Sequence, residues 1–221
     1  MLICVIINSK YLDNTVGSVL TEKQKSLIVG TLLGDGCLEK RWANSRLRID
    51  HYSVNRDYVF WKYKILENIA SNKPRIVRQL DKRSEKVCER WAFATHAEPA
   101  LNPYFNFLYK TGKKKLNPSL IKLFKYPLSL AVWFMDDGYK RNDCNAIRFS
   151  TDCFTLDENL ILQKCLKMNF GINSKIHKKG KVWNIYVPTG EMNKVREIVF
   201  PYISEVKSMM YKLPQPVTTC S

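Results

Sequence analysis

Two apolar stretches decide the fold of this chain, LIVGTLLGDG at residues 27–36 and LAVWFMDDG at residues 130–138. Each carries no charged side chain until its acidic end, where Asp35 and Asp137 each precede a glycine. The two aspartates lie 102 residues apart (137 − 35), nearly half of the 221-residue chain. A repeat at that spacing predicts that the chain is built from two similar halves.

The same order of elements is expected after each apolar stretch. Alternating polar and apolar residues predict strands with one polar face, and apolar residues at helical spacing predict the helices that follow them. In the second half Thr155 and Glu158 form a capping-box pattern, and Lys179-Gly180 suits a hairpin turn. The expected segments are strands at 46–52 and 147–152, helices at 55–70 and 156–170, hairpins at 75–95 and 175–187, and closing helices near 99–110 and 190–203.

This order predicts an α+β fold of two α-β-β-α-β-β-α units related by a pseudo-twofold axis. The two apolar helices are expected to form a central two-helix interface, where Gly30 and Gly34 allow close approach and Ala131 offers a small side chain. The expected segments are an N-terminal segment at 1–20, a first half at 21–110, a polar linker at 111–118, a second half at 119–214 and a tail at 215–221.

The composition indicates a polyanionic partner. Lys and Arg number 36 against 20 Asp and Glu, a formal charge of +16. The basic residues are spread through strand-like segments with Tyr, Trp and Asn, which favours nucleic acid over a membrane surface. For each single residue the alternative is a solvated surface charge. The candidate DNA-binding residues on the polar strand faces and the hairpins are Arg46, Arg48, Asp50, Arg75, Arg78, Arg90, Arg148, Ser150, Asp152, Lys175, Lys178, Lys179 and Lys181.

The cysteines and the N-terminus add little chemistry. Seven cysteines form no CxxC pair and no Cys/His cluster, so reduced and mostly buried thiols are expected. The apolar run Leu2–Ile7 is too short to span a membrane and is expected to be either a strand or a mobile end. We expect no secretion signal.

Two carboxylates at the ends of neighbouring helices repel each other unless a cation lies between them. Oxygen-only ligands suit Mg²⁺ better than zinc. Asp35 and Asp137 therefore predict a divalent-metal site for phosphoryl chemistry. The alternative is that each Asp-Gly only ends a helix, with Gly36 and Gly138 as left-handed caps. Two copies in register favour the metal site.

The paired stretches, together with MMYKLP at 209–214, resemble the LAGLIDADG homing endonucleases. The resemblance implies two saddle-like antiparallel sheets that straddle a long DNA site, and hydrolysis of both strands with Mg²⁺ in support of intron mobility. It also implies that Mn²⁺ substitutes for Mg²⁺ and that Ca²⁺ supports binding without cleavage. A monomer that acts as a pseudo-dimer in an organelle, with no membrane association, is expected.

The resemblance also implies roles for individual residues. The metal ligands map to Asp35 and Asp137; the preceding positions Gly34 and Asp136 are counted with the metal site, but the ligand role is not assigned to Asp136. The active-site lysines map to Lys212, from the MMYKLP match, and to either Lys114 or Lys115. The usual Gln or Asn at the end of the first polar strand is missing, which leaves as candidates Asp50 or Ser53 and Ser150 or Asp152.

Other functions are compatible with parts of this pattern. An intron RNA maturase on the same scaffold would bind RNA tightly and cut DNA weakly. A DNA-binding regulator without nuclease activity would tolerate the loss of one aspartate, and both are present. A basic structural protein would make the register of the two stretches a coincidence.

Overall fold

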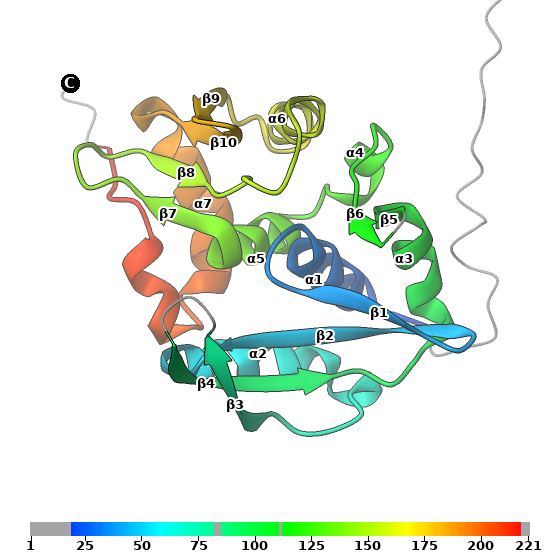
Figure 1. Cartoon of the computed structure of the whole chain (residues 1–221). Coiled ribbons are helices and arrows are strands. Elements are labelled where there is room, and N and C mark those ends of the chain that lie inside the picture. The colour runs from blue at the N-terminus through cyan, green and yellow to red at the C-terminus, as the bar shows by residue number, and fades with distance from the viewer. Residues whose placement is uncertain (1–18, 82–84, 111, 218–221) are drawn as a thin grey trace, which may run out of the picture.

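A computed structural model describes residues 19–81, 85–110 and 112–217 of the chain. Helices α1 (Glu22–Leu33) and α5 (Pro127–Asp137) lie side by side in the middle of the molecule, between two four-stranded sheets (Figure 1). These helices are the two apolar stretches of the sequence. The expected strand or mobile end at Leu2–Ile7 lies outside the described residues.

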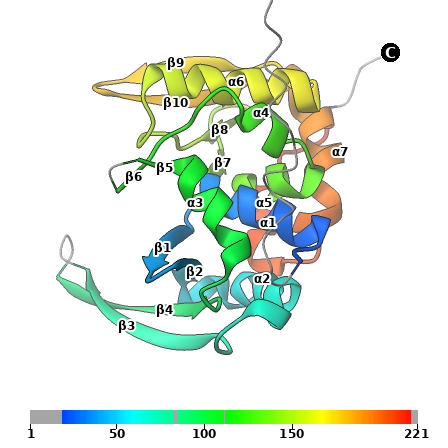
Figure 2. The ribbon, with the colours of Figure 1, turned by 90° about the vertical axis from the view of Figure 1, so that its right-hand side faces the viewer.

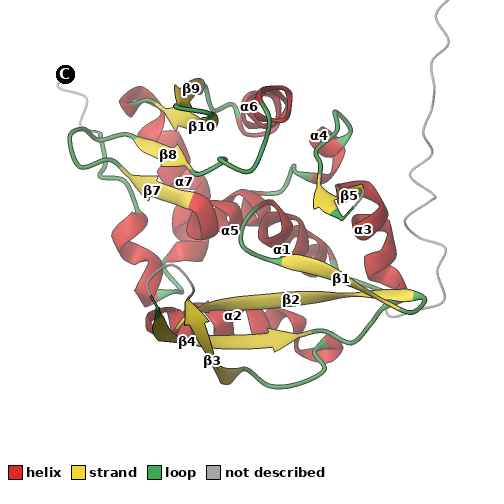
Figure 3. Cartoon of the chain, viewed as in Figure 1, coloured by secondary structure: helices red, strands yellow, loops and turns green. Residues whose placement is uncertain are grey.

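The two halves repeat one α-β-β-α-β-β-α order, which confirms the predicted α+β duplication (Figure 3). The first half consists of α1, β1 (Cys37–Arg41), β2 (Asn44–Tyr52), α2 (Arg56–Leu66), β3 (Arg75–Asp81), β4 (Lys86–Ala94) and α3 (Asn102–Leu108). The second half consists of α5, β7 (Gly138–Lys140), β8 (Ile147–Phe149), α6 (Leu156–Phe170), β9 (Lys175–Lys179), β10 (Val182–Val187) and α7 (Met192–Ile203). The segment between the halves contains β5 (Tyr109–Lys110), β6 (Lys113–Lys114) and α4 (Leu120–Leu123).

Both sheets are antiparallel and share one strand order, β1-β2-β4-β3 in the first half and β7-β8-β10-β9 in the second. Figure 2 shows the hairpins β3–β4 and β9–β10 projecting from the same side of the molecule. The sheets therefore form two arms on either side of the central helices, which is the saddle expected from the sequence.

Local signals in the sequence set the helix boundaries. Capping boxes open α1 (Thr21 with Gln24) and α6 (Thr155 with Glu158), and the second of these was predicted. Helix α6 ends at Gly171, whose φ of 66° suits glycine. Several expected boundaries are confirmed within a few residues.

The central helices touch through equivalent positions of the two signatures. A Cβ on Gly30 would lie 2.5 Å from the carbonyl oxygen of Ser129 and 2.7 Å from Cβ of Val132, its counterpart in α5. A Cβ on Gly34 would lie 2.6 Å from Oδ2 of its counterpart Asp136. Glycine at both positions is therefore required by space, and the predicted interface is confirmed. Ala131 is fully buried in α5.

Apolar residues on the inner faces of the sheets complete the core. Leu47 and Ile49 of β2 are buried, and in the second half the Trp133 ring of α5 stacks on Phe149 of β8 at 4.0 Å between centroids. Helix α2 covers the inner face of the first sheet and α6 that of the second. The outer faces of both sheets remain open.

The structure differs from the expected elements in three details. Strand β8 ends at Phe149, three residues before the expected end at 152. Helix α3 ends at Leu108, not near 110, since residues 109–110 pair with 113–114 as a small hairpin. The expected polar linker is therefore partly a strand.

The cysteines also differ from expectation. Of the five cysteines in the described residues, Cys165 is buried, Cys37 and Cys88 are partly buried, and Cys144 and Cys153 are exposed. All five are free thiols, as predicted, but they are not mostly buried. None of the helices in the described ranges has both the length and the apolar character that crossing a membrane requires.

Candidate functional site

Asp35 and Asp137 stand at the C-terminal ends of the two central helices. Asp137 is the last residue of α5, and Asp35 follows Gly34, the residue that caps α1. The side chain of Asp35 is half exposed. The two aspartates are 102 residues apart in the sequence, yet the charge of Asp35 acts on Asp137 and contributes to its raised pKa.

The Asp-Gly pairs are not simple helix caps. Neither Gly36 nor Gly138 adopts the left-handed conformation of such a cap. Each is instead packed closely: an added Cβ would lie 3.0 Å from the carbonyl oxygen of Thr31 at Gly36, and 2.5 Å from that of Phe134 at Gly138. These glycines let the chain fold back against the helix that it leaves, so the expectation of left-handed caps at Gly36 and Gly138 is wrong.

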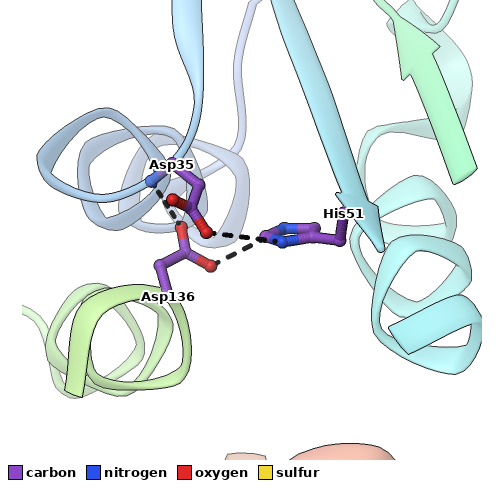
Figure 4. Close-up of side chains that lie close together, drawn as sticks. All are labelled: Asp35, His51 and Asp136. Atoms are coloured by element: carbon purple, nitrogen blue, oxygen red, sulfur yellow. Dashed lines mark hydrogen bonds and ion pairs between the residues drawn. The ribbon is translucent and has the colours of Figure 1, made fainter. Parts of the chain in front are cut away.

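Figure 4 shows Asp35, His51 and Asp136 gathered around one point, with potential ligand atoms within 4.8 Å of one another. His51 Nδ1 lies 3.5 Å from Asp35 Oδ2, and His51 Nε2 lies 3.7 Å from Asp136 Oδ1. The backbone N–H of Asp35 donates to Asp136 Oδ2 at 3.3 Å. One acidic residue from each half and a strand histidine therefore share this cluster.

A buried ion pair holds the Asp136 side chain from the other direction. Lys62 of α2 donates to Oδ1 and Oδ2 of Asp136 at 2.8 and 3.1 Å, and both side chains are fully buried. The Tyr58 hydroxyl donates to Oδ1 at 2.7 Å. Both carboxylate oxygens of Asp136 are thus engaged by donors from the first half, so a cation there would face the charged amino group of Lys62.

Burial and mutual repulsion control the ionisation of these groups. Burial, reinforced by the charges of Asp136 and Asp35, raises the pKa of Asp137 to about 8. Burial and the Asp136 charge also raise the pKa of Asp35. Burial lowers the pKa of His51 to about 3, aided by Lys62, so the imidazole is neutral. Burial also opposes ionisation of Asp136, but Lys62 and the hydrogen bonds outweigh it and lower its pKa.

Two lysines occupy equivalent places at the helix ends. Lys114 of β6 donates to the carbonyl oxygen of Gly34 at 2.9 Å, and Lys212 donates to those of Met135 and Asp136 at 2.5 and 3.0 Å. Lys115 is exposed. Burial lowers the pKa of both Lys114 and Lys212. The geometry therefore brings Lys114, and not Lys115, to the helix ends.

The candidates for the end of the polar strand fall in different places. Asp50 is bound by Arg48 and Arg90 on the open face, and Ser53 begins the 3₁₀ turn after β2. The backbone N–H of Ser150 donates to the carbonyl oxygen of Asp137, whereas Asp152, two residues further along, is exposed. The residue that faces Asp35 is His51, which sequence reasoning missed. The sequence did contain a signal for it: His51 is a titratable side chain two residues after Ile49, on the strand face that Leu47 and Ile49 bury.

Sequence reasoning also missed Lys62. It stands four residues from Tyr58 and from Leu66, both of which are buried, so it occupies the apolar stripe of α2. A lysine in such a stripe is almost never fully buried without a partner. The pattern therefore marks Lys62, but the identity of its partner depends on the fold.

The open face of the first sheet carries most of the arginines predicted for DNA. On this face Glu39 binds Arg41 and Arg46 at 3.1 and 2.7 Å, and Arg48 lies between Glu39 and Asp50. Asp50 also binds Arg90. Two carboxylates thus fix the orientation of four guanidinium groups in one connected network.

The strand register places two of the predicted DNA-binding residues on the opposite face of their sheets. Arg75 and Arg90 lie on the open face, but Arg78 pairs opposite Glu89 and points to the other face, where it forms an ion pair at 3.0 Å. In the second sheet Lys178 lies opposite Trp183 and its amino group stands 5.5 Å from that ring, again on the other face. The sequence analysis assigned all the charged hairpin residues to one face. Which residues point to which face depends on the strand register, which the sequence alone did not give.

The open face of the second sheet is built differently. Tyr186 of β10 lies between Arg148 of β8 and Lys175 of β9. Lys179 lies on the same face of β9 as Lys175. The His177 ring stacks on Tyr186 at 4.8 Å between centroids. Lys181 is exposed in the turn beyond Gly180. Within the part of the chain that the structure describes, this face presents cations and aromatic rings, and no carboxylate forms an ion pair with Arg148, Lys175 or Lys179.

The model of the LAGLIDADG DNA endonuclease family matches residues 25–195. The chain belongs to this family. As a LAGLIDADG protein it is 30% identical to DNA endonuclease I-ChuI of Chlamydomonas applanata, over 88% of this chain and 95% of that protein. It is 32% identical to cytochrome b mRNA maturase bI2 of Saccharomyces cerevisiae, over 93% of this chain and 50% of the longer maturase.

Solved structures agree with this assignment of the fold. The LAGLIDADG chain superimposes on the homing endonuclease I-WcaI bound to its DNA recognition sequence with a TM-score of 0.82 at 24% identity. The likeness covers 90% of this chain and 89% of I-WcaI. Both sheets and the central helices therefore have the arrangement of a LAGLIDADG homing endonuclease.

Proposed function

We propose that this chain is a monomeric homing endonuclease that hydrolyses both strands of a long double-stranded DNA site with Mg²⁺. One observation carries the proposal: each central helix ends in an aspartate beside a lysine-bound carbonyl, Asp35 with Lys114 and Asp137 with Lys212. The two equivalent sets of groups are related by the pseudo-twofold symmetry of the chain, so that each set can act on one strand of a DNA duplex.

The donors at the helix ends fit a hard divalent cation. The carboxylates of Asp35 and Asp137 and the carbonyl oxygens of Gly34 and Asp136 are all oxygen ligands, which Mg²⁺ prefers. Burial and the charge of Asp136 raise the pKa values of Asp35 and Asp137, so a positive charge beside these carboxylates would favour their ionised form. Bound Mg²⁺ would supply that charge and a more acidic water for attack on phosphorus. Mn²⁺ is expected to substitute, and Ca²⁺ to support binding alone.

The side chain of Asp136 is not among the proposed ligands. Its two oxygens already accept hydrogen bonds from Lys62, Tyr58 and the Asp35 amide. The carboxylate of Asp35, in contrast, is half exposed and can reach a cation on its open side.

The lysines and the open faces complete the proposed chemistry. The amino groups of Lys114 and Lys212 would hold positive charge where charge develops on a scissile phosphate. The arginines of the first sheet and the Arg148 face of the second would contact DNA, as β-ribbons fit the major groove. The fold shared with I-WcaI, which is bound to its DNA recognition sequence, supports this placement.

The test is cleavage of a large DNA library by the purified protein with Mg²⁺. Wild-type protein is expected to cut one long site, whereas Asp35→Asn and Asp137→Asn should lose cutting and still bind DNA in Ca²⁺. Lys114→Met is expected to lose activity and its matched neighbour Lys115→Met to retain it. A wild-type protein that cuts no member of the library would overturn the proposal.

A second candidate function is an intron RNA maturase, because the likeness to maturase bI2 extends over 93% of this chain. Specific binding of an intron transcript, measured beside DNA cleavage, would support it. An organelle is the proposed location, a proposal supported by the likeness to a maturase of cytochrome b mRNA.

A further inference from the structure

The Asp136 side chain belongs to the second half by sequence, but its hydrogen-bond and ion-pair partners come from the first. Tyr58 and Lys62 stand on α2, His51 on β2, and the Asp35 amide follows α1. Asp136 thus reaches across the pseudo-twofold axis, into the space that Gly34 leaves open.

The two halves differ at this point. The position equivalent to Asp136 in the first signature is Gly34, which has no side chain to offer to the second half. The backbone of Asp35 is therefore held by a carboxylate from the other helix, and the backbone of Asp137 is not held by an equivalent one. Asp136 should therefore affect the geometry of the proposed metal ligand Asp35 and not that of Asp137.

Stability alone gives little reason for this arrangement. A buried ion pair loses so much hydration that apolar residues of the same size often stabilise a core equally well. An ion pair does, however, fix the position of its groups, because each charge is costly to leave unpaired. Lys62 therefore does more for the placement of Asp136 than for the folding free energy.

We propose that Lys62 and Asp136 are positioning residues that hold Asp35 in place, so that the second half sets the rate at which the Asp35 side cuts its DNA strand. The inference rests on the proposed nuclease function. Lys62 fixes the carboxylate of Asp136, Asp136 accepts the amide of Asp35, and the Asp35 carboxylate is thereby aimed at its cation.

The test uses a target duplex with a different label on each strand, so that each strand's rate constant is measured under single-turnover conditions with Mg²⁺. Lys62→Met is expected to slow one strand on the order of 10- to 100-fold, the range for small misplacements of a reacting group. The other strand should slow much less, so that the ratio of the two rate constants changes.

Two further variants separate positioning from folding. Lys64→Met makes the same chemical change at an exposed site of the same helix, and its strand ratio should equal that of the wild type. The double variant Lys62→Met with Asp136→Leu removes both charges together, so it should fold even where Lys62→Met alone does not. Thermal melting and DNA binding in Ca²⁺ confirm that each protein is intact.

The double variant should still show the altered strand ratio, because its Asp35 amide has lost its acceptor. An unchanged ratio in a folded variant, or an equal loss on both strands, would overturn the inference and leave the nuclease proposal standing. Absence of cutting by the wild type would instead overturn the nuclease proposal.

Discussion

The carboxyl group of Asp137 has an unusually high pKa of about 8, because it is largely buried and lies near two other carboxylates. In the unfolded chain the same group ionises near its ordinary value of 3.8. The folded protein therefore binds one more proton than the unfolded chain between these values. Folding stability from this group is full at low pH and is lost as pH rises through the folded pKa.

We expect thermal melts of the metal-free protein to show a midpoint that falls as pH rises from about 5 to 8. Asp137→Asn should flatten this slope, since it removes the titrating group. Added Mg²⁺ should stabilise the protein more at pH 8 than at pH 6, because metal and proton compete for the carboxylate. A slope that Asp137→Asn leaves intact would assign the pH dependence to other groups.

Gly34 gives a second prediction at the scale of one residue. An added methyl group would lie 2.6 Å from Oδ2 of Asp136, in a well-packed interface. Gly34→Ala should therefore lower the free energy of unfolding by about 1 to 3 kcal/mol, the usual effect of overpacking. Gly190→Ala is the matched control, because nothing lies within 4 Å of its added Cβ. Equal denaturation midpoints for the two variants would contradict the close approach.

Single residues were predictable where a short pattern carries the information. Asp35 and Asp137 follow from the repeated signature, and Lys212 follows from the MMYKLP segment. His51 and Lys62 were not predicted, because each has polar partners contributed by the second half. A buried charge becomes meaningful only when its partner is known, and tertiary structure supplies that partner.

At the scale of elements, the network on β1 and β2 has a consequence for specificity. Glu39 and Asp50 hold four arginines in place, which restricts where each guanidinium group can reach. Glu39→Gln should free Arg41 and Arg46 and remove one negative charge. Affinity for unrelated DNA should rise, by up to about fivefold for ion pairs worth ~1 kcal/mol, and discrimination should fall.

Glu89→Gln makes the same change on the other face of the sheet, beside Arg78. Its binding to the target and to a scrambled duplex should stay close to the wild type. Titration of both duplexes with each variant at one salt concentration measures the ratio. The idea fails where Glu39→Gln and Glu89→Gln have the same effect.

The elements themselves were largely predictable, because their signals are local. The capping box at Thr155 and the hairpin turn at Gly180 place α6 and the β9–β10 hairpin correctly. The end of β8 and the β5–β6 hairpin were not predicted. The strands of the β5–β6 hairpin are two residues long, too short to show an alternating pattern in the sequence.

The whole molecule combines a net charge of +16 with two open sheet faces. A protein that neutralises many phosphates releases many counterions, so its DNA affinity falls steeply as salt rises. We expect a linear fall of log affinity against log salt, with a smaller slope in Arg75→Ala and Arg148→Ala variants. A flat response would place the DNA away from these faces.

The meeting of Gly34 and Asp136 also means that the two halves cannot replace each other. Two identical copies of the first half would bring glycine against glycine at this place, and such helices could pack about a true twofold axis. Two copies of the second half would bring Asp136 against Asp136, with no room for either side chain and one lysine donor fewer than the present arrangement provides. A dimer of two second halves would therefore lack the space that Gly34 provides for the Asp136 side chain.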